Sequence, residues 1–147
     1  MKEIREFKDQ YRFLSNFWPA SVEYDGVVYP SVESAYQAAK TLDLPARRQF
    51  EDCAPSSAKR RGSRLVLRPD WEDVKLEVMT ELVTKKFSCN SELREKLLAT
   101  EDALLIEGNW WEDTFWGVSP VRSNKGTNWL GMILMEVRDM LRMGTVP

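Results

Sequence analysis

The chain has 147 residues and a formal net charge of −2, with 21 Lys and Arg against 23 Asp and Glu. Hydrophobic residues make up 43% of it and charged residues 30%, which is typical of a globular protein and excludes a disordered one. The sequence has no histidine, which excludes Ser-His-Asp and Cys-His nucleophile systems and every zinc site that contains histidine. Acid–base chemistry must therefore use Asp, Glu, Lys or Tyr.

The charge balance and the apolar runs also limit the class of protein. A net charge of −2 argues against a protein that coats nucleic acid, because such binding draws on Lys and Arg to neutralise phosphates. No apolar run approaches the roughly 20 residues that span a bilayer, and the N-terminal residues have no apolar signal core. We expect a cytoplasmic protein with one domain over residues 1–147, reduced thiols at Cys53 and Cys89, and no association with a membrane.

The first half of the chain is predicted to hold a hairpin followed by short helices. Asp25-Gly26 favours a tight type I′ turn, so residues 21–30 are expected to form the hairpin. Ser31 is suited to a helix N-cap, and the helix after it is expected to end near residues 40–42. Further short helices are predicted from residue 44 and over residues 55–62.

The second half is predicted to be mostly helical. Residues 70–87 show one apolar stripe, with acids in the first turn and lysines in the last, as the helix dipole favours. A helix from Ser91, a short strand over 104–106 and a helix over 128–142 complete the pattern, and the last helix is expected to be packed on most of its surface. Residues 107–127 form a loop that is long for a compact domain, and such loops are often functional.

The helix that begins after Ser31 carries polar groups on its repeating face. Glu33, Tyr36, Gln37 and Lys40 recur at i, i+3, i+4 and i+7, a spacing that places them on one stripe. A carboxylate and an amine facing one cavity can act as acid and base, and a desolvated lysine can form an imine with a carbonyl-like carbon. The alternative is an ordinary amphipathic helix with a solvated polar face.

The loop contains the run Trp110 to Gly117, WWEDTFWG, in which acids are bracketed by aromatics. Tryptophan faces stack on heterocycles, and Asp113 beside them could stabilise a developing oxocarbenium ion or activate a water. In the alternative interpretation the tryptophans belong to the core and the acids are solvated. Two smaller features are the RFLSNF run at 12–17 and the basic cluster formed by residues 59–61 and Arg64, which is either solvated or faces a phosphate.

Five motifs in a fixed order resemble the NADAR family, also called YbiA-like N-glycosidases. They are FLSNF at 13–17, YPSVE-x-AYQAAK at 29–40, KF at 86–87, DTFWG at 113–117 and G-x-N-x-LG-x-x-LM at 126–135. The resemblance covers nearly the whole chain. It implies cleavage of N-glycosidic bonds in nucleotide-like compounds, either phosphorylated riboflavin-pathway intermediates or guanine bases that carry ADP-ribose.

The resemblance also implies functional residues. The catalytic set is Glu33, Lys40 as the lysine that forms an imine, and Asp113. The substrate-binding set is Arg12, Phe13, Asn16, Tyr36, Trp71, Trp116, Gly117 and Asn128. Family sequences often have His where this chain has Ser34, for which we expect a supporting role at most, because one residue turns about 100° around a helix from Glu33.

We therefore predict an α+β fold, mostly helical with a small antiparallel sheet. The pocket is expected between the helix that follows Ser31, the loop 107–127 and the N-terminal segment. The predicted function is an N-glycosidase, a monomer without a metal or redox cofactor, that acts on a small nucleotide-like substrate or on ADP-ribosylated nucleic acid. Two other classes stay open: a non-catalytic binder of ADP-ribose, nucleotides or ADP-ribosylated nucleic acid, and an interaction domain that buries its aromatics against a partner.

Overall fold

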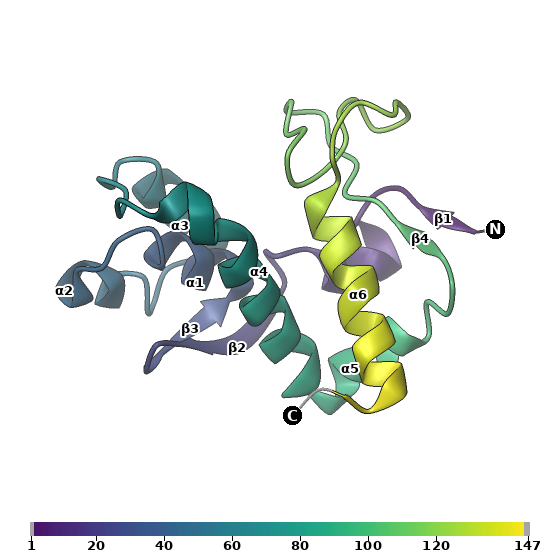
Figure 1. The fold of residues 1–147 in the computed structure, drawn as a ribbon, viewed down its shortest axis with the longest axis horizontal. Coiled ribbons are helices and arrows are strands. Elements are labelled where there is room, and N and C mark those ends of the chain that lie inside the picture. Colours follow the sequence, from purple (N-terminus) through teal and green to yellow (C-terminus); the bar gives the residue numbers. More distant parts are fainter. Residues whose placement is uncertain (1, 146–147) are drawn as a thin grey trace. The chain divides into compact units, whose positions relative to one another are not determined.

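A computed structural model describes residues 2–145 of the chain, drawn in Figure 1. Its contacts divide it into two compact units. One unit is the continuous segment Asn16–Lys86, and the other joins the residues up to Ser15 to those from Phe87 onward. Each unit has its own small pair of strands and its own helices.

The unit Asn16–Lys86 begins with the predicted hairpin. Strand β2 (Pro19–Tyr24) pairs antiparallel with β3 (Val27–Ser31), in a register that places Tyr24 opposite Val27. The connecting residues Asp25 and Gly26 both have positive φ, of 50° and 86°, as a type I′ turn requires. Alternate residues of β3 are buried, so one face of the hairpin packs on the core of this unit.

Four helices follow the hairpin. They are α1 (Val32–Ala38), α2 (Leu44–Arg48), α3 (Pro55–Gly62) and α4 (Trp71–Ser88). Ser31 caps α1 as predicted, because its hydroxyl accepts the backbone N–H of Ser34 at 3.0 Å. Helix α1 is shorter than predicted and ends at Ala38. Most of the apolar stripe predicted for α4 is confirmed, since Trp71, Val78, Leu82 and Val83 are buried, whereas Val74 is half-buried.

Within the described residues, the other unit holds two short strands and three helices. They are β1 (Glu3–Ile4), the 3₁₀ helix η1 (Asp9–Leu14), α5 (Ser91–Leu98), β4 (Leu104–Leu105) and α6 (Trp129–Met143). Strand β4 confirms the strand predicted over 104–106 and pairs parallel with β1. Sequence reasoning missed β1, because two residues are too few to show a period of two.

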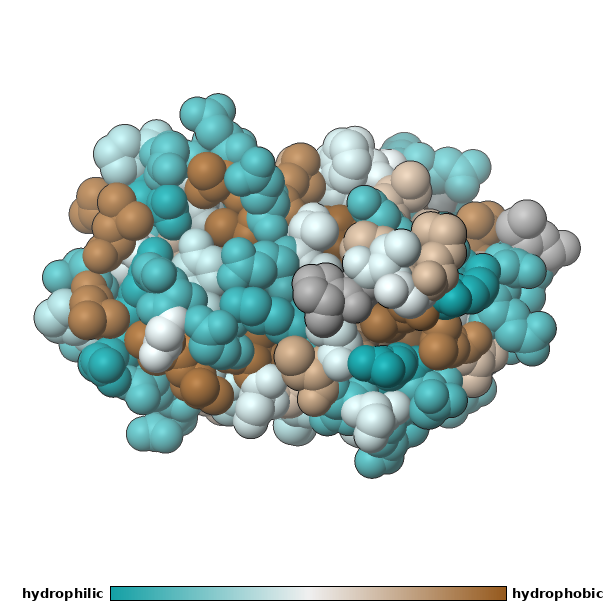
Figure 2. Space-filling model, turned by 60° about the horizontal axis from the view of Figure 1, so that its bottom comes forward, coloured by the Kyte–Doolittle hydropathy of each residue, from teal (hydrophilic) through white to brown (hydrophobic). Residues whose placement is uncertain are grey.

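Helix α6 corrects one prediction. Its buried residues Leu130, Ile133, Leu134 and Val137 lie at i, i+3, i+4 and i+7, which defines one face. Met132 is 52% exposed and Trp129 is 37% exposed, so the helix is amphipathic and is not packed on most of its surface. Exposed apolar side chains occur elsewhere on the chain too, and Figure 2 shows a face on which apolar residues stand among polar ones.

The α+β fold class is confirmed: helices dominate, and the antiparallel pair β2–β3 is the small sheet that was predicted. Within residues 2–145, no helix combines the length and the apolar character that crossing a membrane demands. The single domain over residues 1–147 stays a prediction.

Candidate functional site

Helix α1 holds the predicted acid in a defined position. The backbone N–H of Glu33 donates to the carbonyl of Asn16 at 3.1 Å, which fixes the first turn of the helix. The half-buried carboxylate of Glu33 accepts the side-chain amide of Gln37, one helical turn later, at 2.9 Å between Oε2 and Nε2. Glu33 is therefore oriented by two hydrogen bonds from within its own unit.

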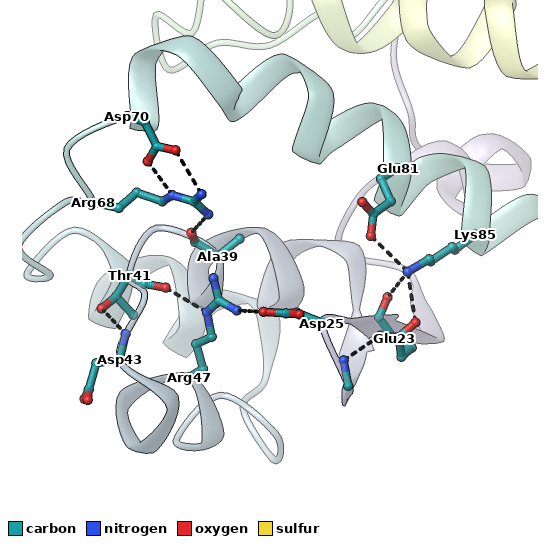
Figure 3. A network of polar contacts seen from close by, with 11 residues as sticks. Glu23, Asp25, Ala39, Thr41, Asp43, Arg47, Arg68, Asp70, Glu81 and Lys85 are labelled. Atoms are coloured by element: carbon teal, nitrogen blue, oxygen red, sulfur yellow. Dashed lines mark hydrogen bonds and ion pairs between the residues drawn. The ribbon is translucent and has the colours of Figure 1, made fainter.

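The segment after α1 carries Lys40, and two arginines hold its backbone in place. The backbone N–H of Arg68 donates to the carbonyl of Lys40 at 2.7 Å, and its guanidinium donates to the carbonyl of Ala39 at 3.4 Å. The guanidinium of Arg47 donates to the carbonyl of Thr41 at 2.7 Å (Figure 3). Three successive carbonyls around Lys40 are thus satisfied, which positions its side chain without a longer helix.

Those two arginines are themselves anchored by carboxylates. Arg47 is buried and pairs with Asp25 of the hairpin turn at 2.8 Å. Arg68 makes two hydrogen bonds to the carboxylate of Asp70, at 2.7 and 3.1 Å (Figure 3). The hairpin turn and the residue that precedes α4 therefore both brace the backbone that carries Lys40.

The amine of Lys40 lies beside an aromatic pair. Its Nζ is 5.7 Å from the ring centroid of Tyr36, whose ring packs 5.1 Å from that of Trp71. Burial lowers the pKa of Lys40 and is the largest effect on it; the nearby Glu33 opposes this shift, while Lys59 and Lys75 add to it. A lowered pKa increases the share of neutral amine, which is the form that attacks a carbon centre.

Trp71 and Tyr36 are both buried, with 4% and 6% of their surface exposed. The structure thus gives Trp71 a packing role against Tyr36. A direct stacking role for Trp71 on a substrate ring stays a prediction. Ser34, which replaces the family's frequent His, is fully buried, and its hydroxyl donates to the carbonyl of Cys53 at 2.9 Å. Ser34 therefore ties α1 to the segment before α3.

In the other unit, the loop that begins after Glu107 is organised by one residue that sequence reasoning missed. Asn109 is fully buried, and its Oδ1 accepts the backbone N–H groups of Trp111 and Asp113 at 3.2 and 3.1 Å. Its Nδ2 donates to the carbonyl of Asp113 at 2.9 Å. A single asparagine thereby closes the turn WWED, and the only sequence signal for it was an amide residue directly before the two tryptophans.

Asp113 continues the same loop. Its Oδ1 accepts the backbone N–H groups of Phe115 and Trp116 at 3.1 and 2.9 Å, so this oxygen shapes the turn that leads into FWG. Gly117 follows where the chain passes close to itself, because a Cβ there would collide with the carbonyl of Glu107. The loop geometry explains the residue types of DTFWG, while catalysis by Asp113 and binding by Trp116 and Gly117 stay predictions.

Asn128, at the start of α6, joins the loop to β4 through side-chain hydrogen bonds. It adopts a left-handed conformation, with φ of 51°. Its Nδ2 donates to the carbonyl of Leu105 at 3.0 Å and its Oδ1 accepts the N–H of Glu107 at 2.9 Å. Both ends of the side-chain amide therefore bind backbone, which gives Asn128 a structural role; its predicted contact with substrate stays a prediction.

The predicted residues near the N-terminus divide between the units. Phe13 is buried and packs edge-on against Phe87, with centroids 6.4 Å apart, whereas Arg12 is exposed. Asn16 belongs to the unit Asn16–Lys86, where its Nδ2 lies 3.6 Å from the sulfur of Met79. The substrate-binding roles predicted for these residues stay predictions.

The exposed tryptophans favour neither simple interpretation of the loop. Trp110 is 67% exposed and Trp111 is 60% exposed, so these two are not core residues. Because Asn109 fixes the turn beneath them, they are presented on an ordered loop rather than on a loose one. The alternative that placed the tryptophans in the core is wrong for this pair.

The basic cluster borders a groove in the unit Asn16–Lys86. The groove has a volume of about 490 Å³ and is lined by Ala46, Gln49, Phe50, Arg61, Arg64 and Leu65. Arg61 donates to the carbonyl of Gln49 at 3.0 Å. Lys59, by contrast, is one of the charges that lower the pKa of Lys40, so the basic run is divided between two environments.

A second lysine was also missed. Lys86 is 2% exposed, and burial lowers its pKa to about 7 from an ordinary 10.5. Its position beside Phe87 in the KF motif was noted from the sequence, but its burial was not. Within the described residues, no group of three or more Cys, Asp or Glu is arranged to hold a metal ion.

Comparison with protein families gives a match over almost the whole chain. A model described as the NADAR domain matches residues 4–142. The chain belongs to the NADAR family. The match confirms the resemblance drawn from the five motifs and includes most of both units.

Named relatives and a solved structure agree with this membership. N-glycosidase YbiA of Escherichia coli is 40% identical over 138 residues, which cover 90% of this chain and 83% of the relative. An N-glycosidase of Nostoc punctiforme is 36% identical and is covered to 86%. The NMR structure of YbiA from E. coli matches with a TM-score of 0.81 at 36% identity, covering 98% of this chain and 88% of that one.

A riboflavin biosynthesis protein of Vibrio vulnificus is 38% identical over 137 residues. The match covers 91% of this chain but 36% of that protein, so the chain spans about a third of its length. The relatives that match over most of their own length are named N-glycosidases, which confirms the predicted class of enzyme, an N-glycosyl hydrolase.

Proposed function

We propose that the protein hydrolyses the bond between C1 of a ribose and a nitrogen of a heterocyclic base or amine, with Glu33 and Lys40 as the reacting groups. The observation that carries this proposal is the Glu33–Lys40 arrangement in one unit. The carboxylate is held by Gln37, and the amine has a pKa lowered by burial. The names of the relatives support the bond type.

In the proposed reaction, the carboxyl group of Glu33 gives its proton to the leaving nitrogen while the C1–N bond breaks, and the bonding electron pair leaves with the base. The neutral amine of Lys40 then forms a bond to C1, and opening of the sugar ring gives an imine. Water adds to the imine, releases the sugar as its free aldehyde and restores the amine. The sum is riboside plus water giving free base plus sugar.

A direct route uses the same two residues differently. The carboxylate of Glu33 activates the water that attacks C1, and Lys40 contributes only its charge. Borohydride added during turnover distinguishes the two routes, because it reduces an imine to a stable amine. We expect an adduct on Lys40, located by peptide mapping. An adduct on the buried Lys86 would reassign the nucleophile, and no adduct during active turnover would favour direct hydrolysis.

Two substrate groups fit the proposal. The first is a phosphorylated ribosylaminopyrimidine, which the riboflavin name of the Vibrio relative supports. The second is guanine that carries ADP-ribose, in DNA or RNA. We would incubate the protein with one probe of each group and follow the free base by mass spectrometry.

The expected result is base release from at least one probe by the native protein and a loss of about a thousandfold in Glu33→Gln. Lys96→Gln is the matched surface control and should keep native turnover. Release by Glu33→Gln at the native rate would remove Glu33 from the mechanism.

The exposed Trp110 and Trp111 favour a second candidate, a binder of nucleotides or ADP-ribosylated nucleic acid that uses both rings as stacking platforms. This candidate predicts binding without base release. Quenching of tryptophan fluorescence by a probe that stays intact would support it, whereas loss of the quenching in Trp110→Ala with turnover unchanged would assign the rings to an accessory contact.

A further inference from the structure

The side chain of Gln37 is buried but incompletely hydrogen-bonded. It is 5% exposed, and its Nε2 donates to Glu33 at 2.9 Å. Its Oε1 has no hydrogen-bond partner among residues 2–145. A buried amide oxygen without a donor is unfavourable for folding, and such groups in a native protein call for a reason.

The unpartnered oxygen faces Gly62, the last residue of α3. A Cβ on Gly62 would collide with Oε1 of Gln37, would lie 2.6 Å from its Cδ and 3.0 Å from its Cβ. The backbone of Gly62 is helical, so no positive φ calls for glycine there. What the position requires is the missing side chain.

The unpartnered oxygen and the missing side chain at Gly62 thus meet at one amide, the amide that donates to Glu33. We propose that Gln37 is a positioning residue that orients the carboxylate of Glu33. The missing side chain at Gly62 leaves the space that the amide of Gln37 occupies. This inference rests on the proposed function of Glu33. Neither Gln37 nor Gly62 is expected to touch the substrate.

The hydrogen bond has a chemical consequence. The amide N–H binds one carboxyl oxygen of Glu33, Oε2, which leaves the proton that Glu33 donates to be carried on Oε1. The amide also restricts rotation of the carboxyl group about its last bond. Without Gln37, Glu33 would keep its place on α1 but lose both the donor and the fixed orientation.

A titration that needs no substrate tests this directly. Protein labelled with ¹³C at the glutamate carboxyl carbons is titrated by NMR, and Glu33→Gln identifies the Glu33 signal by its disappearance. Gln37→Met keeps the length of the side chain but removes the N–H, and should move the Glu33 midpoint to higher pH, because an N–H donor favours the ionised carboxylate. Gln49→Met, an exposed exchange of the same type in the same unit, should leave the midpoint unchanged.

Gly62→Ala tests whether the space beside Gly62 is needed to position the amide of Gln37. It should displace the amide, shift the Glu33 midpoint upward and lower the turnover of the responding probe about tenfold, as Gln37→Met does. In a Gln37→Ala background there is no amide to displace, so adding Gly62→Ala should cost no further activity. Thermal unfolding should show Gln37→Met to be at least as stable as the native protein, because an unsatisfied buried acceptor is removed.

The outcomes separate the two proposals. If Glu33→Gln is inactive while Gln37→Met keeps the native midpoint and the native pH profile, the positioning role is wrong and the function of Glu33 stands. If Glu33→Gln is fully active, the proposed function itself is wrong. Additive losses from Gly62→Ala and Gln37→Ala would show that Gly62 acts through something other than the amide.

Discussion

Helix α1 and the loop that Asn109 organises use their polar residues in opposite ways. In the loop, the side chains of Asn109, Asp113 and Asn128 bind backbone groups of their own unit, and together they hold the chain from β4 to α6. In α1, the amide of Gln37 binds another side chain, the carboxylate of Glu33, and leaves its own oxygen unsatisfied.

This difference separates polar groups that stabilise the fold from polar groups that the fold positions for possible chemistry. A side chain that satisfies backbone donors lowers the free energy of the folded state, whereas a buried amide with an orphan oxygen and a desolvated amine both raise it. Polar residues of the second kind are candidates for chemistry. The comparison therefore predicts that changes in the loop act first on stability and that changes around Glu33 act first on turnover.

The largest effect on stability is expected for Asn109→Leu. The substitution leaves the N–H groups of Trp111 and Asp113 without their acceptor. Because Asn109 is fully buried, water does not readily replace that acceptor. We expect the free energy of unfolding to fall by about 3 kcal/mol, measured by urea denaturation. Glu33→Gln, measured in the same way, should change it by less than about 0.5 kcal/mol, because Glu33 is only half-buried. Equal losses of stability in the two variants would show that Asn109 and Glu33 do not differ in this way.

Lys86 should produce a dependence of stability on pH. Its pKa is about 7 in the folded protein and about 10.5 when unfolded, so below pH 7 it is protonated in both states and the cost of burying its charge is fully present. As the pH rises from 7 toward 10.5, the folded state releases this proton first. The free energy of unfolding should therefore rise, by at most about 1.4 kcal/mol per pH unit.

Denaturation curves at several pH values check this rise, which should be missing in Lys86→Met. Lys85→Met is the matched control, because Lys85 bonds to Glu23 and Glu81 and has a raised pKa that lies outside the window. A rise that survives in Lys86→Met would assign the titration to another group.

Much of the fold could be predicted from local signals. The Asp25-Gly26 turn, the Ser31 cap and the stripe on α4 each depend on a few neighbouring residues, so the sequence contains the whole cause. The pairing of β1 with β4 could not be predicted, because it joins two dipeptides about a hundred residues apart. The extent of α1 was overestimated because Arg47 and Arg68 stabilise a non-helical path after Ala38.

The candidate site was predictable as a set of residues but not as a set of roles. Helical spacing predicted Glu33 and Lys40 on one face, but Lys40 lies beyond the end of α1. The structure adds that Gln37 donates to the carboxylate of Glu33. The same spacing could not show that Trp71 packs under Tyr36 or that Asn128 binds backbone at both ends. The residue type in a motif shows what chemistry a side chain can do. The groups that the side chain contacts in the fold determine whether it does so.

Asp113 gives the smallest and sharpest contrast, because it is both a predicted catalytic acid and the residue whose Oδ1 accepts the N–H groups of Phe115 and Trp116. Asp113→Asn keeps an oxygen at that place, so the free energy of unfolding should stay within about 0.5 kcal/mol of native, while Asp113→Ala should lose about 1 kcal/mol. If the carboxylate only shapes the turn, Asp113→Asn keeps its turnover. If it is also an acid or a base, Asp113→Asn loses turnover at native stability. An amide can replace a carboxylate as a hydrogen-bond acceptor but not in proton transfer. The second result would therefore give Asp113 a role in the reaction, as proposed for Glu33, in addition to its role in the turn.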